Sequence, residues 1–288
     1  MTLMTGKAAA LRTILGDGKG PLLVAGAHDG LTAVLAEQAG FGAVWASSFE
    51  ISAAAALPDA SLLGMGEYLT ATRQMNDAVT VPVIADCDTG FGNNLNVVHA
   101  VQQYEAAGVA AVCFEDKHFP KLNSFAGQGQ DLVSAEDFAS KIEAAKKAQR
   151  DPDFMVIARV ATLIAGGTVD QALERAHAYA DAGADALLIH SKDRTPERVV
   201  EFLRRWDRRL PAVVVPTTYF EWSAAAAWEA GAAIVIFANQ GLRATVTATR
   251  STLDHIVSNG SSADLEGSIA SVKEIFGIQK LDQWLAYE

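Results

Sequence analysis

Short apolar segments alternate with amphipathic segments along almost the whole chain. Eight segments, rich in Val, Ile, Leu and Ala, have the length and composition of buried strands. They cover residues 22–27, 43–47, 81–86, 110–115, 154–160, 186–190, 212–216 and 233–238. Helical periodicity fills the intervals, over residues 31–40, 64–79, 95–107, 135–148, 169–182, 196–207 and 222–230. The pattern therefore predicts strands and helices in regular alternation.

Strands that are apolar on both faces need cover on both sides of a parallel sheet. Eight strand–helix units predict an α/β protein with a (β/α)8 TIM-type barrel, whose functional groups lie at the carboxyl ends of the strands. A doubly wound open sheet is the main alternative, but no Gly-x-Gly-x-x-Gly motif follows the first predicted strand. We expect a single domain over residues 1–288. An additional C-terminal helix, indicated by the pattern at residues 271–276, is expected to pack on a neighbouring subunit.

The charge and composition argue against several classes of partner. The chain has a formal net charge of −11 and no basic block, so we expect no nucleic-acid partner. No apolar segment approaches the ~20 residues that span a bilayer, and residues 1–20 lack the apolar core of a secretory signal. The cysteines, Cys87 and Cys113, give no disulfide framework. We expect a cytoplasmic enzyme without a membrane partner.

Acidic residues follow two consecutive predicted strands. Asp86 and Asp88 come at the end of the third strand, and Glu115 ends the fourth. The two-residue period of a strand places Asp86 and Asp88 on one face. Three carboxylates at neighbouring strand ends form a hard oxygen site, which suits Mg²⁺ or Mn²⁺ better than zinc. The alternative is a solvated acidic turn punctuated by Gly90 and Gly92.

Other strand ends carry groups able to bind a small anion. Arg159 lies at the end of the fifth strand and His190 at the end of the sixth. An arginine holds an oxyanion through two hydrogen bonds, and a nearby metal ion can chelate an α-keto acid or its enolate. These groups suit a substrate with a carboxylate, a carbonyl oxygen and a phosphoryl group. The alternatives are a structural ion pair for Arg159 and a structural role for His190.

The longest connection without periodicity follows the fourth strand and covers residues 118–131. Its length and its paired glycines, beside the acidic residues, are typical of a lid. We therefore expect a gating loop at about residues 117–133. It would carry Lys121, Asn123 and Ser124 over the substrate and exclude water, which protects an enolate or a metaphosphate-like species.

Two motifs resemble those of a known family. Residues 86–93 read Asp-Cys-Asp-Thr-Gly-Phe-Gly-Asn, and residues 115–124 read Glu-Asp-Lys-His-Phe-Pro-Lys-Leu-Asn-Ser. Both closely resemble the phosphoenolpyruvate mutase and phosphonopyruvate hydrolase branch of the isocitrate lyase superfamily, and the similarity extends from about Leu22 to the C-terminal helix. The resemblance implies a barrel whose last helix is swapped between subunits, in a homodimer or homotetramer.

The resemblance also implies roles for individual residues. Four acidic residues would form the site for Mg²⁺ or Mn²⁺, one in direct contact and the other three largely through bound water: Asp86, and then Asp59, Asp88 and Glu115. Four residues of one segment would bind the phosphoryl or carboxyl end of the substrate: Trp45, Ser47, Ser48 and Phe49. Five catalytic residues would surround the migrating phosphoryl group or act on the gating loop: Lys121, Asn123, Ser124, Arg159 and His190.

By this resemblance the enzyme interconverts phosphoenolpyruvate and phosphonopyruvate. Breaking the P–C bond leaves a pyruvate enolate, stabilised by the metal and Arg159, and the phosphoryl group passes to the enolate oxygen. Lyases of the superfamily carry a gating-loop cysteine that is absent here, and Asn123 favours the mutase over the hydrolase. Ser48 and Ala161 depart from the family pattern, which usually has Gly and Glu there. The alternatives are phosphonopyruvate hydrolase, which gives pyruvate and phosphate, an oxaloacetate-type decarboxylase or lyase, and a non-catalytic barrel that binds an oxo acid.

Overall fold

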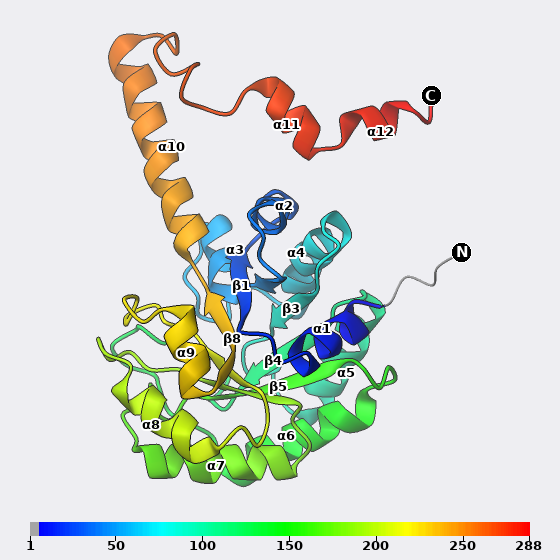
Figure 1. Ribbon diagram of the computed structural model, residues 1–288, viewed down its shortest axis with the longest axis vertical. Coiled ribbons are helices and arrows are strands. Elements are labelled where there is room, and N and C mark those ends of the chain that lie inside the picture. The colour runs from blue at the N-terminus through cyan, green and yellow to red at the C-terminus, as the bar shows by residue number, and fades with distance from the viewer. Residues whose placement is uncertain (1–5) are drawn as a thin grey trace. The chain divides into compact units, whose positions relative to one another are not determined.

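The computed structural model describes residues 6–288. Its eight strands are β1 (Leu22–Ala27), β2 (Ala43–Ala46), β3 (Val83–Asp86), β4 (Ala111–Glu115), β5 (Met155–Val160), β6 (Ala186–Ile189), β7 (Ala212–Val214) and β8 (Ala232–Phe237). They pair in parallel and in chain order, and β8 also pairs with β1, so the sheet closes into a barrel (Figure 1). The predicted (β/α)8 barrel is confirmed.

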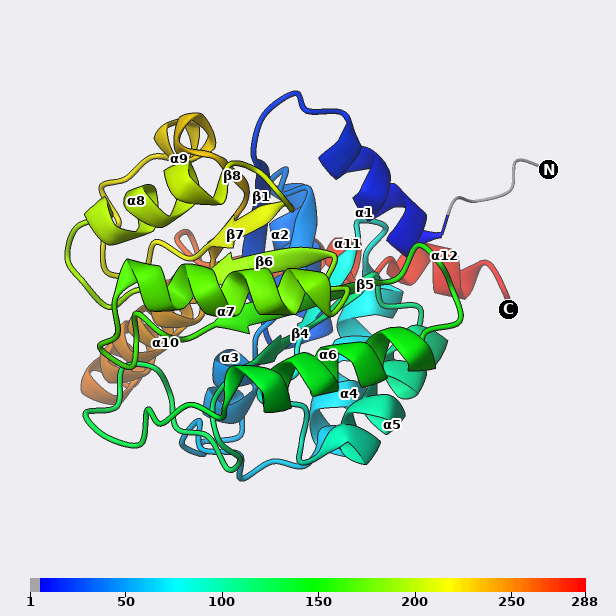
Figure 2. The ribbon, with the colours of Figure 1, turned by 90° about the horizontal axis from the view of Figure 1, so that it is seen from below.

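Helices connect the strands and cover the outside of the barrel. They are α1 (Lys7–Gly16), α2 (Gly30–Gln38), α3 (Ser48–Ala54), α4 (Met65–Ala78), α5 (Asn94–Ala106), α6 (Ala135–Ala148), α7 (Val169–Asp181), α8 (Glu197–Trp206) and α9 (Ala224–Ala230). Figure 2 shows α6, α7 and α8 along the outer surface. Capping side chains begin several helices: the Ser134 side chain accepts a hydrogen bond from the N–H of Asp137, and Thr168 forms a capping box with Gln171. These caps fix where the loops from the strand ends turn into helices.

Apolar packing lies on both sides of the barrel sheet, because successive strand residues face opposite sides. In β4, Cys113 joins the cluster inside the barrel, whereas Val112 and Phe114 pack outward with helix residues. Leu11 of α1 is fully buried in the inner cluster together with Leu22, the first residue of β1. Helix α1 therefore closes the barrel at the amino ends of the strands, and polar groups gather at the opposite end.

The second compact unit of the chain is Gln240–Glu288, and the barrel lies in the first, Met1–Asn239. This second unit contains α10 (Gln240–Asn259), α11 (Val272–Ile278) and α12 (Leu281–Leu285), and no residue of these helices is buried. Helix α11 lies at the predicted helical pattern. That the two units form one domain stays a prediction. Among the helices of residues 6–288, none has both the length and the apolar character that crossing a membrane would require.

All eight strands were predictable from apolar segments, and their observed ends lie within two residues of the predicted ones. Strand β3 starts at Val83 rather than at residue 81, because Pro82 has no N–H to donate to a neighbouring strand. Helices α1, α3, α10 and α12 were not predicted as elements. The first turn of α3 is buried beside the polar site, at Ser48 and Glu50, so the amphipathic pattern of a surface helix is missing there.

Candidate active site

Three predicted carboxylates lie at the carboxyl ends of adjacent strands. Asp86 is the last residue of β3 and Glu115 the last of β4. Asp88 lies beyond the strand, with a left-handed backbone at φ 49°, and its N–H donates to Asp86 Oδ1 at 3.4 Å. The sequence predicted that Asp86 and Asp88 lie on one face of a strand, but the strand ends at Asp86. A turn, rather than strand periodicity, directs the Asp88 side chain.

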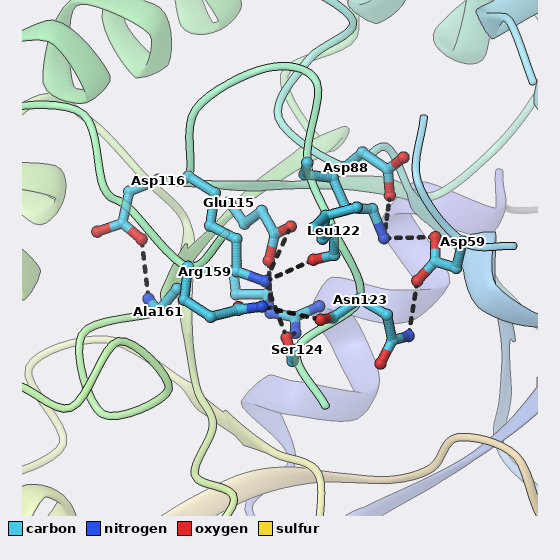
Figure 3. A network of polar contacts seen from close by, with 12 residues as sticks. Asp59, Asp88, Glu115, Asp116, Leu122, Asn123, Ser124, Arg159 and Ala161 are labelled. Atoms are coloured by element: carbon cyan, nitrogen blue, oxygen red, sulfur yellow. Dashed lines mark hydrogen bonds and ion pairs between the residues drawn. The ribbon is translucent and has the colours of Figure 1, made fainter. Parts of the chain in front are cut away.

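The predicted gating loop, residues 117–133, folds onto these carboxylates (Figure 3). The Lys121 ammonium lies 2.6 Å from Asp59 Oδ1 and 3.1 Å from Asp88 Oδ1, and its side chain is almost completely buried. Asn123 donates from its side chain to Asp59 Oδ2 at 2.7 Å and from its backbone N–H to the Asp59 carbonyl at 3.0 Å. Lys121 N also donates to Ser61 Oγ at 3.0 Å. The loop and the segment around Asp59 thus form one hydrogen-bonded unit.

A second group of contacts joins the gating loop to β4 and β5 (Figure 3). Arg159 Nε lies 3.2 Å from Glu115 Oε2, and Arg159 Nη2 donates to Ser124 Oγ at 2.8 Å. Lys117 donates to the same hydroxyl at 3.1 Å and to the Leu122 carbonyl at 3.0 Å. Burial lowers the pKa of Lys117 to about 8. Arg159 thus ion-pairs with Glu115 while one of its nitrogens reaches the loop.

His190 is buried, and its ring lies edge-on to the ring of Phe125 from the gating loop, at 5.7 Å between centroids. Burial holds the pKa of His190 well below its ordinary value, and the positive charges of Arg159 and Lys117 lower it further. Its Nδ1 has no hydrogen-bond partner among the described residues. His190 is therefore a neutral imidazole that contacts the loop through Phe125.

The predicted substrate-binding segment runs from β2 into α3. The Ser47 side chain caps α3 by accepting from the N–H of Glu50 at 3.3 Å, and Ser48 Oγ donates to Asp86 Oδ2 at 3.0 Å. Phe49 is partly exposed. Trp45, in contrast, packs in the apolar cluster inside the barrel. The structure thus joins Ser48 to the acidic residues, whereas Trp45 is part of the apolar core.

Negative charge exceeds positive charge at this site. Four carboxylates face three cations, which leaves one negative charge in excess: Asp59, Asp86, Asp88 and Glu115 against Lys117, Lys121 and Arg159. Burial raises the pKa of Asp86 and raises that of Asp88 to about 7. Burial also opposes the ionisation of Glu115, but Arg159 and Lys117 outweigh it and lower the Glu115 pKa. An additional cation would relieve the repulsion between these carboxylates.

The donor atoms suit a hard divalent cation. Both carboxylate oxygens of Asp88 are buried and accept no hydrogen bond among the described residues, and all four acidic side chains offer only oxygen. Within residues 6–288, however, no three Asp, Glu, His or Cys side chains are arranged to hold a metal ion. Lys121 instead supplies the positive charge between Asp59 and Asp88. The acidic residues have the ligand chemistry that Mg²⁺ requires. In this structure the ammonium of Lys121 lies between two of them.

Comparisons with known proteins agree with this geometry. The family model for phosphoenolpyruvate phosphomutase matches residues 11–257. The chain belongs to this family. A crystal structure of phosphoenolpyruvate phosphomutase from Streptomyces platensis subsp. rosaceus is 52% identical and covers 98% of both chains, with a TM-score of 0.96. The phosphonopyruvate hydrolase of Variovorax sp. (strain Pal2) is 46% identical over 98% of both chains.

A further structure bears on the ligand chemistry of the phosphoenolpyruvate phosphomutase family and its neighbours. Phosphonopyruvate hydrolase, crystallised in complex with oxalate and Mg²⁺, is 44% identical to this chain and covers 98% of both chains, with a TM-score of 0.92. The resemblance to the mutase and hydrolase branch, read from the two sequence motifs, is therefore confirmed.

Sequence reasoning missed the residues that surround Asp116, next to the end of β4. Asp116 is fully buried and accepts from Tyr179 Oη at 2.6 Å, from Arg175 at 3.1 Å and from the N–H of Ala161 at 2.8 Å. The sequence indicates part of this arrangement, because Arg175 and Tyr179 are four residues apart on α7 and so share one face. Their spacing does not indicate which strand end they contact.

Proposed function

We propose that this chain is a phosphoenolpyruvate mutase that interconverts phosphoenolpyruvate and phosphonopyruvate. The observation that carries the proposal is the gating loop, closed over the carboxylates through Lys121 and Asn123. The loop has no cysteine to act as a proton donor to an enolate. An enolate formed under this loop is therefore set up to accept a phosphoryl group rather than a proton. The similarity to a phosphomutase of 52% identity supports the same activity.

Four residues of the site are suited to hold the phosphoryl group during transfer: Asn123, Ser124, Arg159 and His190. Arg159 supplies a fixed positive charge, since its neighbouring carboxylates raise its pKa despite burial. His190 remains neutral, because burial and the nearby cations lower its pKa. A loose phosphoryl-transfer transition state is stabilised mainly by positioning and electrostatics, so no general base is needed. These residues supply hydrogen-bond donors and positive charge, and the transfer requires none of them to remove a proton.

The cofactor of the proposed reaction is Mg²⁺, and Mn²⁺ meets the same requirement for hard oxygen ligands. Asp86, with Asp59, Asp88 and Glu115, would hold it. The cation would supply the positive charge that a developing enolate requires. Ser48 would orient Asp86 through its hydrogen bond of 3.0 Å. The phosphonopyruvate hydrolase crystallised with oxalate and Mg²⁺ supports this assignment.

Hydrolysis of phosphonopyruvate to pyruvate and phosphate is the second candidate, because a phosphonopyruvate hydrolase is 46% identical over 98% of both chains. The two reactions differ only in whether the enolate oxygen or water accepts the phosphoryl group. The closed gating loop favours the enolate, since Lys121 and Ser124 are each only 5% exposed and the loop therefore shields these groups from bulk water.

A coupled assay separates the two candidates. The protein is incubated with phosphonopyruvate and Mg²⁺ in the presence of NADH and lactate dehydrogenase, which detects pyruvate directly. The mutase predicts no NADH oxidation until pyruvate kinase and ADP are added to convert phosphoenolpyruvate to pyruvate. Oxidation before that addition would mean hydrolysis and would overturn the proposal. An Asp88→Asn variant, which removes a proposed metal ligand, should be inactive in both stages and serves as the control.

We also propose that the C-terminal unit packs on a neighbouring subunit, as a swapped helix in a homodimer or homotetramer. Support comes from the apolar side chains that a single chain leaves uncovered: Val257 is 86% exposed and Trp284 70% exposed. Burying such side chains is favourable by about 1.5–3 kcal/mol each. Sedimentation of the full chain should give a dimer or a tetramer, and a monomer at micromolar concentration would contradict this arrangement.

A further inference from the structure

Two buried lysines join the gating loop to the barrel in opposite directions. Lys121 belongs to the loop and reaches Asp59 and Asp88. Lys117 lies just after β4 and reaches into the loop, where it donates to the Leu122 carbonyl at 3.0 Å and to Ser124 Oγ at 3.1 Å. Lys117 is 1% exposed, so its ammonium depends on protein atoms for all its hydrogen bonds.

The loop supplies most of the partners of the Lys117 ammonium. Beyond Leu122 and Ser124, the nearest acidic group is Glu115, whose Oε1 lies 3.9 Å away. An ammonium has three donors, and both of its hydrogen bonds are made to loop residues. If the loop opened, Lys117 would lose both bonds and would have to be rehydrated. The buried charge of Lys117 therefore favours the closed loop.

Backbone contacts place Lys117 where the two ends of the loop meet. Lys117 forms an isolated antiparallel bridge with Leu132. On either side of it, the N–H of His118 donates to the Asp131 carbonyl at 3.2 Å, and the N–H of Val133 donates to the Asp116 carbonyl at 3.0 Å. The backbone at Lys117 thus pairs with the end of the loop at Leu132, while the Lys117 side chain bonds to the middle of the loop at Leu122 and Ser124. One residue fixes both parts relative to β4.

Lys117 also sets the direction of the Ser124 hydroxyl. Ser124 Oγ accepts from Lys117 at 3.1 Å and from Arg159 Nη2 at 2.8 Å. A hydroxyl oxygen has two lone pairs, and these two donors use both. The hydroxyl hydrogen is then left to point toward a third group, so Ser124 can act only as a donor. A substrate oxygen that carries negative charge is the natural acceptor.

We infer that Lys117 is a positioning residue, which holds the gating loop closed and keeps the Ser124 hydroxyl as a hydrogen-bond donor to an anionic oxygen of the substrate. This inference rests on the proposed function for the identity of the substrate, a phosphonate or phosphate ester. The part that concerns loop closure does not depend on which reaction the enzyme performs. It can therefore be tested separately from activity.

The first test measures how often the loop opens. Chymotrypsin can cleave after Phe125, a loop residue that is 46% exposed, once the loop leaves the barrel. In Lys117→Met the loop should be cleaved at least about tenfold faster than in the unchanged protein, because two hydrogen bonds from a charged group are lost. Lys146→Met is the matched control. It breaks a 2.7 Å ion pair with Asp185 that involves no loop residue, and should leave loop cleavage unchanged.

An unchanged cleavage rate in Lys117→Met would overturn the inference, whatever the enzyme proves to act on. If Lys117→Met does not fold, Lys117→Gln gives the same test, since it removes the charge of Lys117 and keeps a polar side chain while the contact between Arg159 and Ser124 stays intact. It should raise loop cleavage by roughly threefold, and no increase would likewise overturn the inference.

The second test asks whether Lys117 acts on the reaction through Ser124 or only stabilises the fold. Lys117→Met and Ser124→Ala should each lower kcat more than they raise KM, and the double variant should lose much less than the product of the two single effects. Fully multiplicative effects would mean that Lys117 does not act through Ser124 and would overturn that part of the inference. The Lys146→Met control should retain its kcat.

Discussion

Replacing Tyr179 by Phe tests whether the hydrogen bonds around Asp116 are structurally important. Tyr179 is fully buried; its hydroxyl donates to Asp116 Oδ2 at 2.6 Å and accepts from Arg175 at 3.0 Å. The substitution keeps the ring and removes only the hydroxyl. Asp116 retains Arg175 and the N–H of Ala161, but loses its shortest hydrogen bond. The contact between Asp116 and Ala161, just after the end of β5, is therefore weakened but not removed.

The magnitude follows from the charge on the acceptor. A buried hydrogen bond to a charged group contributes about 1.5–3 kcal/mol, whereas one between neutral groups contributes about 0.5–1.5 kcal/mol. Tyr68→Phe is the matched control, because the Tyr68 hydroxyl is equally buried and pairs only with the neutral Ser52 hydroxyl, at 2.9 Å. For a chain of this size, Tyr179→Phe should lower Tm by roughly 2–5 °C.

Urea unfolding followed by circular dichroism measures both losses. Tyr179→Phe should lower the free energy of unfolding by about 1 kcal/mol more than Tyr68→Phe does, at an unchanged urea dependence. Equal losses in the two variants would refute the reasoning, since they would mean that the charge of Asp116 adds nothing to the bond from Tyr179.

Three further predictions concern the site itself. Because burial holds the pKa of His190 below its ordinary 6.5, the unfolded chain binds a proton at acid pH that the native protein does not, so stability is lost as pH falls through about 6.5. His190→Gln should flatten the fall in Tm between about pH 7 and pH 5, and an unchanged fall would contradict the assignment. Ser48→Ala should weaken Mg²⁺ binding about tenfold by calorimetry, since Asp86 loses its hydroxyl partner, and unaltered affinity would remove Ser48 from this role. Added Mg²⁺ should raise the Tm of the metal-free protein but not that of Asp88→Asn; an equal rise in both would exclude Asp88 as a ligand.

The barrel could be predicted from the sequence because its strands are buried on both faces. A strand such as β4, read as Ala-Val-Cys-Phe-Glu, is apolar until its last residue, so one segment reports both the strand and the position of Glu115. The sequence of helix α10 contains no comparable apolar pattern that would have predicted the helix. The helix has no buried residue within the chain, and therefore its sequence need not carry a stripe matched to the barrel.

The site was predictable as a set of strand ends, but not as a set of contacts. The bond between Lys121 and Asp59 joins residues 62 positions apart, and it depends on how a loop without periodicity folds back. The left-handed turn at Asp88 is equally hidden, because φ above zero is uncommon for a residue other than glycine. Trp45 was equally hidden: its position next to the site in sequence does not show that its side chain packs in the apolar cluster inside the barrel, and its role in substrate binding stays a prediction.

The central claim is that the phosphoryl group passes to the enolate oxygen and not to water. ³¹P NMR of the protein with phosphonopyruvate and Mg²⁺, recorded in water enriched in ¹⁸O, tests this directly. The account predicts that the phosphonate signal is replaced by the phosphate-ester signal of phosphoenolpyruvate, without an isotope shift and without inorganic phosphate. Inorganic phosphate carrying one ¹⁸O atom from the solvent, formed in step with pyruvate, would contradict it.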